Sequence, residues 1–286
     1  MKYIITRSAA LCLCFACCLL VTACTIFKTQ DPVPTDAQAA QSDTLRQTAP
    51  EELIPILHAG GAWEGVPYLN AQEAFLYYYE QGYRIFEYDL SLSSDGRLIG
   101  MHDGAHWGDC DVLSLTYEEF RQLRLENNCT PINEEWLIDT LRQYPDVTVV
   151  VDAKMPTTDR DAEVLLRIEE LQTICDIDLS ANIIPEVFSI AMWEILREHT
   201  SFERYVFSHY KVNYSMDTIL EHFSDERICG IALPLDSSPE LIGQLYRMQQ
   251  LGKQIWVFTC YDAQDVALAV TIGADHVYVD CPEILP

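Results

Sequence analysis

The feature that most constrains the fold is the alternation of short apolar segments with amphipathic ones from residue 54 onward. Several amphipathic stretches, such as 70–82 and 239–252, have helical spacing and end at a glycine. This alternation predicts an α/β protein, a (β/α)8 TIM barrel spanning residues 51–286. Eight apolar segments have the length and composition of buried strands, at 54–58, 85–90, 147–153, 182–186, 204–208, 230–234, 254–259 and 276–280.

An open doubly wound sheet is the alternative to a barrel. No glycine-rich fingerprint with dinucleotide-binding spacing follows the first predicted strand, which disfavours the open sheet.

After the second predicted strand the sequence contains an additional segment before the third. "SSDG" predicts a turn, 97–103 a short extended segment running back, and the remainder a loop and two short helices, the second starting near Pro131. We interpret about 103–135 as a small insertion over the barrel mouth.

Polar residues collect where the predicted strands end, which is where TIM barrels place their chemistry. Packing alone does not account for so many polar side chains at one edge of a buried sheet. The residues are His58, Glu87, Asp89, Asp152, Glu186, Ser208, Thr259 and Asp280.

Three of these residues form a candidate metal site. Glu87 and Asp89 are two apart in one strand and share a face, and Asp152 ends the next strand. Three converging carboxylates suit a hard divalent cation, Ca²⁺ or Mg²⁺. The alternative is pairing with Lys or Arg, although Arg84 has the wrong parity in the strand to serve.

Two histidines are candidate catalytic residues. His58 ends the first strand, and His102 lies where the chain begins to fold back over the mouth. Imidazoles on opposite sides of a phosphate can act as general base and general acid near neutral pH, although either histidine alone would more often be structural. Lys154 shares the face of Asp152 and would hold a phosphate oxygen, bridge to the carboxylates, or do both.

Aromatic residues near the predicted mouth are candidates for the substrate-pocket wall. Trp63 and Trp107 lie on predicted loops and suit an apolar or choline-binding wall, and Phe258 lies near the end of the seventh strand. The alternative for each is the core, where most barrel aromatics lie.

The N-terminus predicts export. Lys2 and Arg7 precede an apolar run, and "LVTAC" resembles a bacterial lipobox in which Cys24 is lipidated. We therefore expect a lipoprotein-type signal peptide at 1–23, a flexible tether at 24–50, and a protein held by a lipid anchor at the bacterial cell envelope. An ordinary signal peptide or an uncleaved anchor helix is the alternative.

Charge and cysteines limit the partners. A net charge of −26 disfavours nucleic acid and anionic membranes, so an anionic substrate would need a local positive centre. No cysteines have zinc-site spacing. Cys110 and Cys129 would pair as a disulfide or remain free buried thiols.

The motifs as a set resemble the glycerophosphodiester phosphodiesterase family. In order, they are "HAGG", "NAQEAF", "GYRIFEYDLSLSSDGRLIGMHD", "VVVDAK" and "WVFTCYDAQDVALAVTIGADHVYVD". The resemblance implies a TIM barrel with a small insertion after the second strand. It also implies metal-dependent hydrolysis of a small-molecule glycerophosphodiester to glycerol 3-phosphate and an alcohol such as choline or ethanolamine.

The family's functional residues fall on positions already singled out. Its histidine pair corresponds to His58 and His102, its metal ligands to Glu87, Asp89 and Asp152, and its substrate lysine to Lys154. Four positions depart from the pattern: Ala59 replaces an arginine that would clamp phosphate, Asp152 replaces a glutamate, and Phe258 and Tyr261 replace a tryptophan and an asparagine. Two other functions remain open, a barrel that binds a phosphodiester without turnover and a phospholipase or lyase that forms a cyclic phosphate.

Overall fold

The computed structural model describes residues 45–46, 48–102, 110–157 and 160–286. The predicted signal peptide, Cys24, most of the predicted tether and Trp107 lie outside the described residues. Within the described ranges, no helix combines the length and apolar character needed to cross a membrane.

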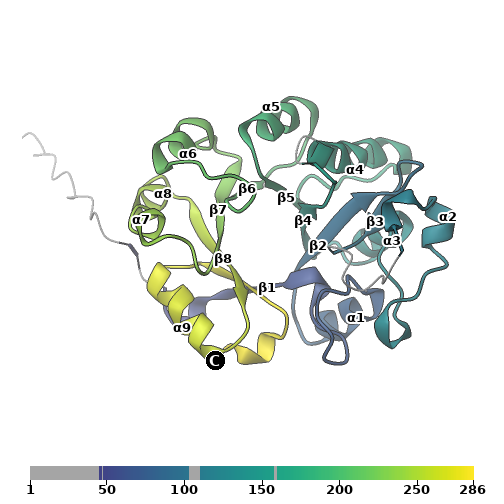
Figure 1. The fold of residues 1–286 in the computed structure, drawn as a ribbon, viewed down its shortest axis with the longest axis horizontal. Coiled ribbons are helices and arrows are strands. Elements are labelled where there is room, and N and C mark those ends of the chain that lie inside the picture. The colour runs from purple at the N-terminus through teal and green to yellow at the C-terminus, as the bar shows by residue number, and fades with distance from the viewer. Residues whose placement is uncertain (1–44, 47, 103–109, 158–159) are drawn as a thin grey trace, which may run out of the picture. The chain divides into compact units, whose positions relative to one another are not determined.

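Eight parallel strands close into a barrel, which confirms the predicted fold (Figure 1). Each strand pairs with its neighbours in chain order, and β1 closes the ring by pairing with both β9 and β2. The strands are β1 (Ile54–Leu57), β2 (Ile85–Leu92), β4 (Thr148–Ala153), β5 (Ile183–Val187), β6 (Tyr205–Ser208), β7 (Ile228–Pro234), β8 (Gln254–Cys260) and β9 (His276–Val279).

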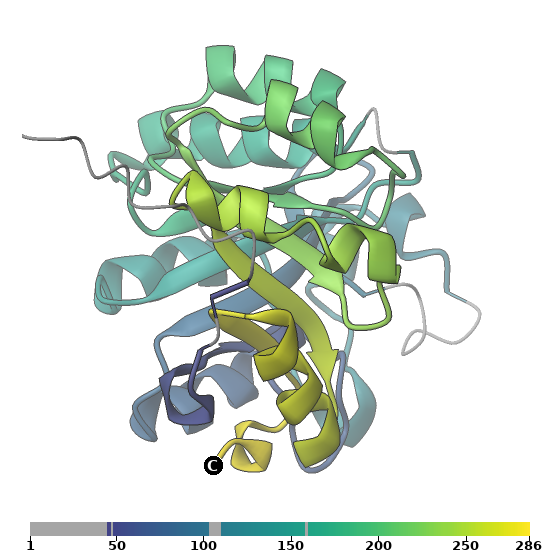
Figure 2. The same cartoon turned by 90° about the vertical axis from the view of Figure 1, so that its left-hand side faces the viewer.

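Helices surround the strands (Figures 1 and 2). Several begin at a side-chain N-cap, for example Ser189 before α5 and Asp262 before α9, as expected for short polar residues at this position. The α-helices are α1 (Gln72–Glu80), α2 (Tyr117–Phe120), α3 (Glu134–Gln143), α4 (Asp161–Cys175), α5 (Ile190–His199), α6 (Met216–His222), α7 (Pro239–Ile242), α8 (Tyr246–Gln250) and α9 (Ala263–Ile272). Short 3-10 helices lie at Pro50–Glu52, His58–Gly60, Val112–Ser114, Glu126–Asn128 and Pro282–Ile284.

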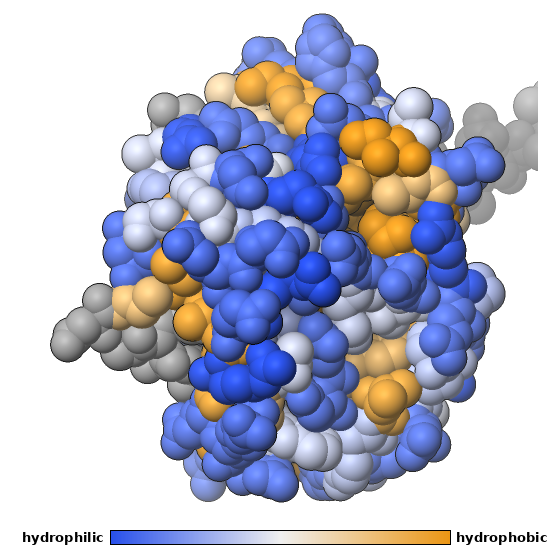
Figure 3. Space-filling view, turned by 90° about the vertical axis from the view of Figure 1, so that its right-hand side faces the viewer, coloured by the Kyte–Doolittle hydropathy of each residue, from blue (hydrophilic) through white to orange (hydrophobic). Residues whose placement is uncertain are grey.

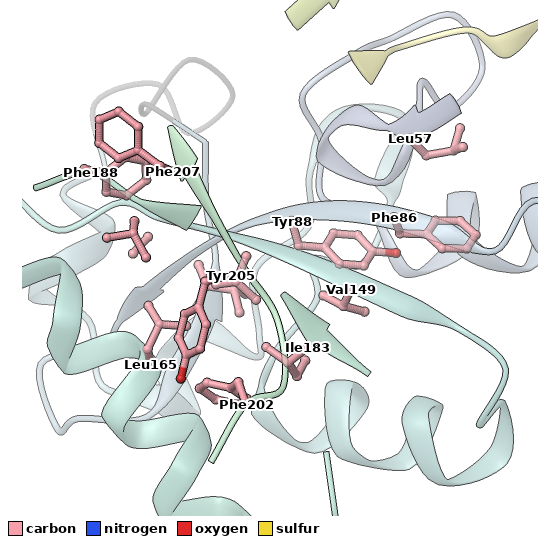
Figure 4. Packing of buried hydrophobic residues seen from close by; sticks show 14 of the residues in the cluster. Leu57, Phe86, Tyr88, Val149, Leu165, Ile183, Phe188, Phe202, Tyr205 and Phe207 are labelled. Atoms are coloured by element: carbon pink, nitrogen blue, oxygen red, sulfur yellow. The ribbon is translucent and has the colours of Figure 1, made fainter. Parts of the chain in front are cut away.

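Strand parity separates two apolar clusters. The barrel interior contains Ile56, Val150, Ile184, Val206, Ala232, Trp256 and Tyr278. The alternate residues, such as Phe86, Tyr88 and Val149, pack in the larger cluster outside the strands (Figure 4). Because side chains alternate along a strand, Glu87 and Asp89 share the inner face with Ile85, and Asp152 shares it with Val150.

The insertion differs in part from its prediction. β3 (Leu98–Gly100) runs back antiparallel to β2, as expected. The second predicted helix is α3, which starts at Glu134 and contacts α1 through Trp136 and Phe75, whose ring centroids lie 5.5 Å apart. It leads directly into β4, so α3 belongs to the outer helical layer and the insertion ends before it.

The described end of the predicted tether contacts the barrel. Arg46 forms an ion pair with Asp275, and its backbone N–H donates to Gln249 at 2.7 Å. Thr48 is buried. Asp275 directly precedes β9, so the chain enters on the N-terminal side of the strands, opposite the strand ends that carry the polar residues.

Candidate active site

The three predicted carboxylates converge inside the barrel mouth. One ligand oxygen from each of Glu87, Asp89 and Asp152 lies within 4.8 Å of the others. The register explains this, because Asp89 is paired with Asp152 across β2 and β4 and Glu87 lies one pleat below. Burial, followed by the charges of Asp89 and Asp152, raises the pKa of Glu87 well above its ordinary value. A group that opposes this charge would stabilise the ionised cluster.

Neutral donors hold two of these carboxylates in place. Asn70 binds Asp89 twice, donating from Nδ2 to Oδ2 at 2.9 Å and accepting the Asp89 backbone N–H at 2.9 Å. The Ala59 N–H donates to Glu87 Oε2 at 2.8 Å, whereas the buried Glu87 Oε1 has no hydrogen-bond partner among the described residues. A buried, unpartnered carboxylate oxygen among acidic neighbours fits a cation ligand.

Lys154 is the nearest cation to this cluster, and Lys211, which pairs with Asp161, lies 4.0 Å from Asp152 Oδ1. Its Nζ lies 2.8 Å from Asp152 Oδ2 and 3.3 Å from Asp89 Oδ1. Burial opposes its charge, but the two carboxylates outweigh burial and raise the pKa of Lys154, which keeps the amine protonated. Arg84, whose parity excluded it as a partner of Glu87 and Asp89, pairs with Asp146 at 2.6 Å.

The two histidines lie together beside the carboxylates. The ring centroids of His58 and His102 are 6.0 Å apart. His58 Nδ1 lies 2.8 Å from Asp280 Oδ1, which favours a proton on Nδ1 and leaves Nε2 free. The Tyr68 ring contacts both imidazoles, at centroid distances of 5.1 Å and 4.7 Å.

Two residues that the sequence reasoning left without a role line the same space. Tyr210 donates its hydroxyl to both oxygens of Asp152, at 3.1 Å and 2.9 Å. Glu186 accepts from the Tyr278 hydroxyl at 2.7 Å, and burial together with the charge of Asp152 raises its pKa to about 7. Glu186 could have been predicted as a site residue, because it ends a strand with its side chain on the inner face. Tyr210 lies in the loop after β6, where no sequence pattern predicts a role in the site.

A cavity of about 90 Å³ joins most of these groups, although Asp89 and His102 are not among its described lining residues. Its volume equals that of about three water molecules, which is the scale of a phosphate group. Phe258 lines it as predicted, whereas Trp63 lies in a different cavity. The lining residues are His58, Glu87, Asp152, Lys154, Glu186, Tyr210, Phe258 and Tyr278.

The "HAGG" turn depends on its glycines. Gly60 has φ +81°, and a Cβ there would lie 2.6 Å from the Tyr88 ring. Ala59 also has a positive φ, 47°, and directs its N–H to Glu87. The turn therefore supplies a backbone donor at the position where the family pattern has an arginine.

The cysteine prediction is settled for the described residues. Cys110 and Cys129 are both free, the first exposed and the second buried. The suggested disulfide is therefore wrong, and the alternative of a free buried thiol holds for Cys129 but not for the exposed Cys110.

Comparisons with known proteins identify the family. The model of the glycerophosphoryl diester phosphodiesterase family matches residues 66–284. The sequence matched none of the curated proteins with which it was compared.

Solved structures share the fold at low sequence identity. A glycerophosphodiester phosphodiesterase from Parabacteroides distasonis has a TM-score of 0.63 and 19% identity, covering 81% of this chain and 94% of its own. An Oleispira antarctica phosphodiesterase, solved with the product sn-glycerol-3-phosphate, has a TM-score of 0.64 and 18% identity, with coverage of 80% and 94%. A Thermotoga maritima glycerophosphodiester phosphodiesterase has a TM-score of 0.61 and 20% identity, with coverage of 80% and 94%.

Three observations point to the same family. They are the barrel fold, the cluster of carboxylates and histidines at its mouth, and the family model that matches most of the chain. The chain therefore belongs to the glycerophosphoryl diester phosphodiesterase family and is a phosphoric diester hydrolase.

Proposed function

We propose that the protein hydrolyses glycerophosphodiesters to glycerol 3-phosphate and an alcohol, with a divalent cation, Ca²⁺ or Mg²⁺, as cofactor. The observation that carries this proposal is the cluster of Glu87, Asp89 and Asp152 beside His58 and His102 at the C-terminal mouth of the barrel. The Oleispira antarctica structure with sn-glycerol-3-phosphate supports the choice of product.

The cation would be held by Glu87, Asp89 and Asp152, where it would withdraw negative charge from the phosphate oxygens. Glu87 Oε1 supports this assignment, since it is buried and makes no hydrogen bond to another described group. Both Ca²⁺ and Mg²⁺ take oxygen ligands, so the donor set is compatible with either ion.

The histidines would move the protons. One imidazole accepts a proton from the nucleophile, water or a substrate hydroxyl, and the other donates a proton to the leaving alkoxide. Asp280 keeps Nδ1 of His58 protonated, so Nε2 is the atom that can exchange a proton with the substrate.

Lys154 would bind a non-bridging phosphate oxygen. It is the only Lys or Arg among the described residues that line the catalytic cavity, and it supplies positive charge where Ala59 replaces an arginine. The Ala59 N–H donates to Glu87, so it would hold a metal ligand in place and would not donate to the phosphate.

The test combines product analysis with metal removal. Wild type is incubated with glycerophosphocholine and related diesters, with and without EDTA, and products are followed by phosphorus NMR. We expect a phosphomonoester, loss of turnover in EDTA, and a decrease in kcat of roughly 10²- to 10⁴-fold in His58→Ala and in His102→Ala.

His199→Ala is the matched control, because His199 is exposed at the end of α5. A cyclic phosphate would favour a lyase, and no product with any diester would favour a binding barrel. Turnover that survives both EDTA and His58→Ala would contradict the mechanism.

We further propose that the protein is exported and held at the cell envelope by a lipid on Cys24. The support is the sequence "LVTAC" after a short apolar run that begins near Lys2 and Arg7. Labelled fatty acid should be incorporated into the wild type expressed in bacteria. The same label in Cys24→Ser would exclude this anchor.

A further inference from the structure

A second cavity, of about 370 Å³, lies outside the catalytic one and shares no lining residue with it. Three segments form it: the turn after β1, helix α1 and the segment after β9. The lining residues are Ala62, Trp63, Glu64, Gly65, Tyr77, Tyr78, Cys281 and Glu283. The volume is in the range of small-ligand pockets.

Aromatic rings form adjacent walls of this cavity. The rings of Trp63 and Tyr77 have centroids 5.9 Å apart and an interplanar angle of 76°. Tyr77 and Tyr78 are likewise nearly perpendicular, at 4.9 Å and 77°. Perpendicular neighbours turn ring faces in different directions, which is how aromatic groups surround a cation.

The walls are pre-positioned by backbone hydrogen bonds. Trp63 and Val66 exchange two N–H···O bonds of 2.9 Å, and the intervening Glu64 and Gly65 have φ values of 50° and 80°. This is a tight two-residue hairpin. The Tyr78 hydroxyl donates to the Ala62 carbonyl at 2.9 Å and ties α1 to the turn.

The charged residues that line the cavity favour a positively charged ligand. Glu64 and Glu283 contribute carboxylates, and within the part of the chain that the structure describes no Lys, Arg or His lines the cavity. An anionic phosphodiester would be repelled here. Within the described residues, the one group of three side chains that could hold a metal ion is Glu87, Asp89 and Asp152. Glu64 and Glu283 do not belong to it, so this cavity has no such metal-ligating group among the described residues.

We propose that this cavity binds an alkylated ammonium group, such as the trimethylammonium of choline. Aromatic faces attract a cation whose surface is apolar, and the two carboxylates add long-range attraction. The group could come from a free small molecule or from a lipid headgroup, and the chemistry of recognition is the same.

The site lies beside the catalytic machinery without forming part of it. The Ala62 N–H donates to the Asp280 carbonyl at 2.7 Å, and the Asp280 carboxylate holds His58. Because the binding groups are separate, binding does not depend on the proposed hydrolysis. It should be retained in His58→Ala.

The experiment titrates wild type and His58→Ala with choline and with its neutral isostere 3,3-dimethylbutan-1-ol, by calorimetry and by tryptophan fluorescence. We expect choline to bind about tenfold more tightly than the isostere. Trp63→Ala and Tyr77→Ala should each weaken choline binding about tenfold, Trp63→Phe should weaken it less, and the distant control Tyr246→Ala should leave it unchanged. Tyr77 is 48% exposed, so its truncation should preserve folding.

Equal binding of the isostere, or undiminished choline binding in Trp63→Ala and Tyr77→Ala, would overturn the proposal. Loss of choline binding in His58→Ala would place choline in the catalytic cavity and would also overturn it. Vesicles of phosphatidylcholine and phosphatidylglycerol distinguish the two sources. If the protein binds phosphatidylcholine vesicles but not phosphatidylglycerol vesicles, and this binding requires Trp63, the ligand is a lipid headgroup. If it binds free choline but neither kind of vesicle, the ligand is a soluble molecule.

Discussion

At the residue scale, the central feature is how Asp152 is held. It is a methylene shorter than the glutamate of the family pattern, and it accepts hydrogen bonds from Tyr210 and an ion pair from Lys154. The Tyr210 ring is in turn held edge-on by Phe188 and Phe258, at centroid distances of 5.4 Å and 5.6 Å. Tyr210 therefore acts as a positioning residue for the shortened carboxylate.

Replacing Tyr210 by phenylalanine tests this role. The ring contacts remain but the hydroxyl that donates to Asp152 is lost, and hydrogen bonds to charged groups contribute about 1.5–3 kcal/mol. We expect the metal concentration for half-maximal activity to rise by about tenfold or more, with the circular dichroism spectrum unchanged. Tyr83→Phe is the matched control. An unchanged metal requirement in Tyr210→Phe would show that the lysines near Asp152, Lys154 and Lys211, position it without the hydroxyl.

At the scale of elements, short connections at strand ends carry the site. The turn after β1 brings the Ala59 N–H to Glu87, and the hairpin of β2 and β3 leads to His102. These connections depend on features that a helix or strand pattern does not contain, namely positive φ values and buried ion pairs.

The tight turn predicts different costs for two alanine substitutions. Gly60 and Gly96 have nearly equal φ values, +81° and +79°, but a Cβ meets Tyr88 at Gly60 and nothing within 4 Å at Gly96. Both changes bear the strain of a positive φ, of order 1 kcal/mol. We expect Gly60→Ala to lower the free energy of unfolding by about 1–3 kcal/mol more than Gly96→Ala in urea titrations. Equal losses would show that Tyr88 moves away at little cost.

Glu134 links β3 to two helices and makes stability depend on pH. It accepts two bonds of 2.9 Å from Arg167, one of 3.1 Å from the Leu98 N–H, and a bond from Arg97. Burial opposes ionisation, but these donors together lower the pKa of Glu134. Because the pKa of Glu134 is lower in the folded than in the unfolded protein, its ionised carboxylate stabilises the fold at any pH above the unfolded-state pKa. This stabilisation is lost as the pH falls through the folded-state pKa.

We therefore expect Glu134→Gln to lower the free energy of unfolding by about 1–3 kcal/mol at pH 7. The difference from wild type should shrink below about pH 4, where wild type also loses the charge. Glu170→Gln removes the exposed partner of the same Arg167 and should cost less than about 0.5 kcal/mol. A Glu134→Gln deficit that is constant from pH 7 to pH 3 would assign the effect to packing.

At the scale of the whole molecule, the chain carries a large excess of negative charge, and Lys154 is the one Lys or Arg among the described residues that line the catalytic cavity. The net charge is −26, and the face in Figure 3 is mostly hydrophilic with separate hydrophobic groups. The mouth of the barrel places Lys154 among Glu87, Asp89 and Asp152, and these carboxylates connect β2 to β4. A cation bound there would remove repulsion between two strands of the barrel.

Metal binding should therefore stabilise the entire fold. At a metal concentration about 100 times Kd, mass action contributes about 2.7 kcal/mol, which corresponds to roughly 5 °C or more in Tm for a domain of this size. We expect Mg²⁺ or Ca²⁺ to raise Tm, EDTA to reverse the shift, and Glu87→Gln to reduce it strongly. Glu240→Gln, in another cavity, should retain it. The same metal shift in Glu87→Gln as in wild type would place the cation elsewhere.

The barrel, and the inward face on which its polar strand-end residues lie, could be predicted from the amino-acid pattern alone. Strands of period two with polar ends place Glu87, Asp89 and Asp152 on one side, and this local rule needs no knowledge of neighbours. The family motifs then predicted the pairing of His58 with His102, and the structure brings their rings to 6.0 Å.

Only the tertiary structure decided which distant loops complete the site. Tyr210 reaches Asp152 across 58 positions of sequence, Asp280 reaches His58 across 222, and Trp63 turns to a second cavity with Tyr77. Periodicity reports the face of a residue within its own element. It carries no information on how far a loop side chain extends or which strand end it meets, because closure of the barrel sets those distances.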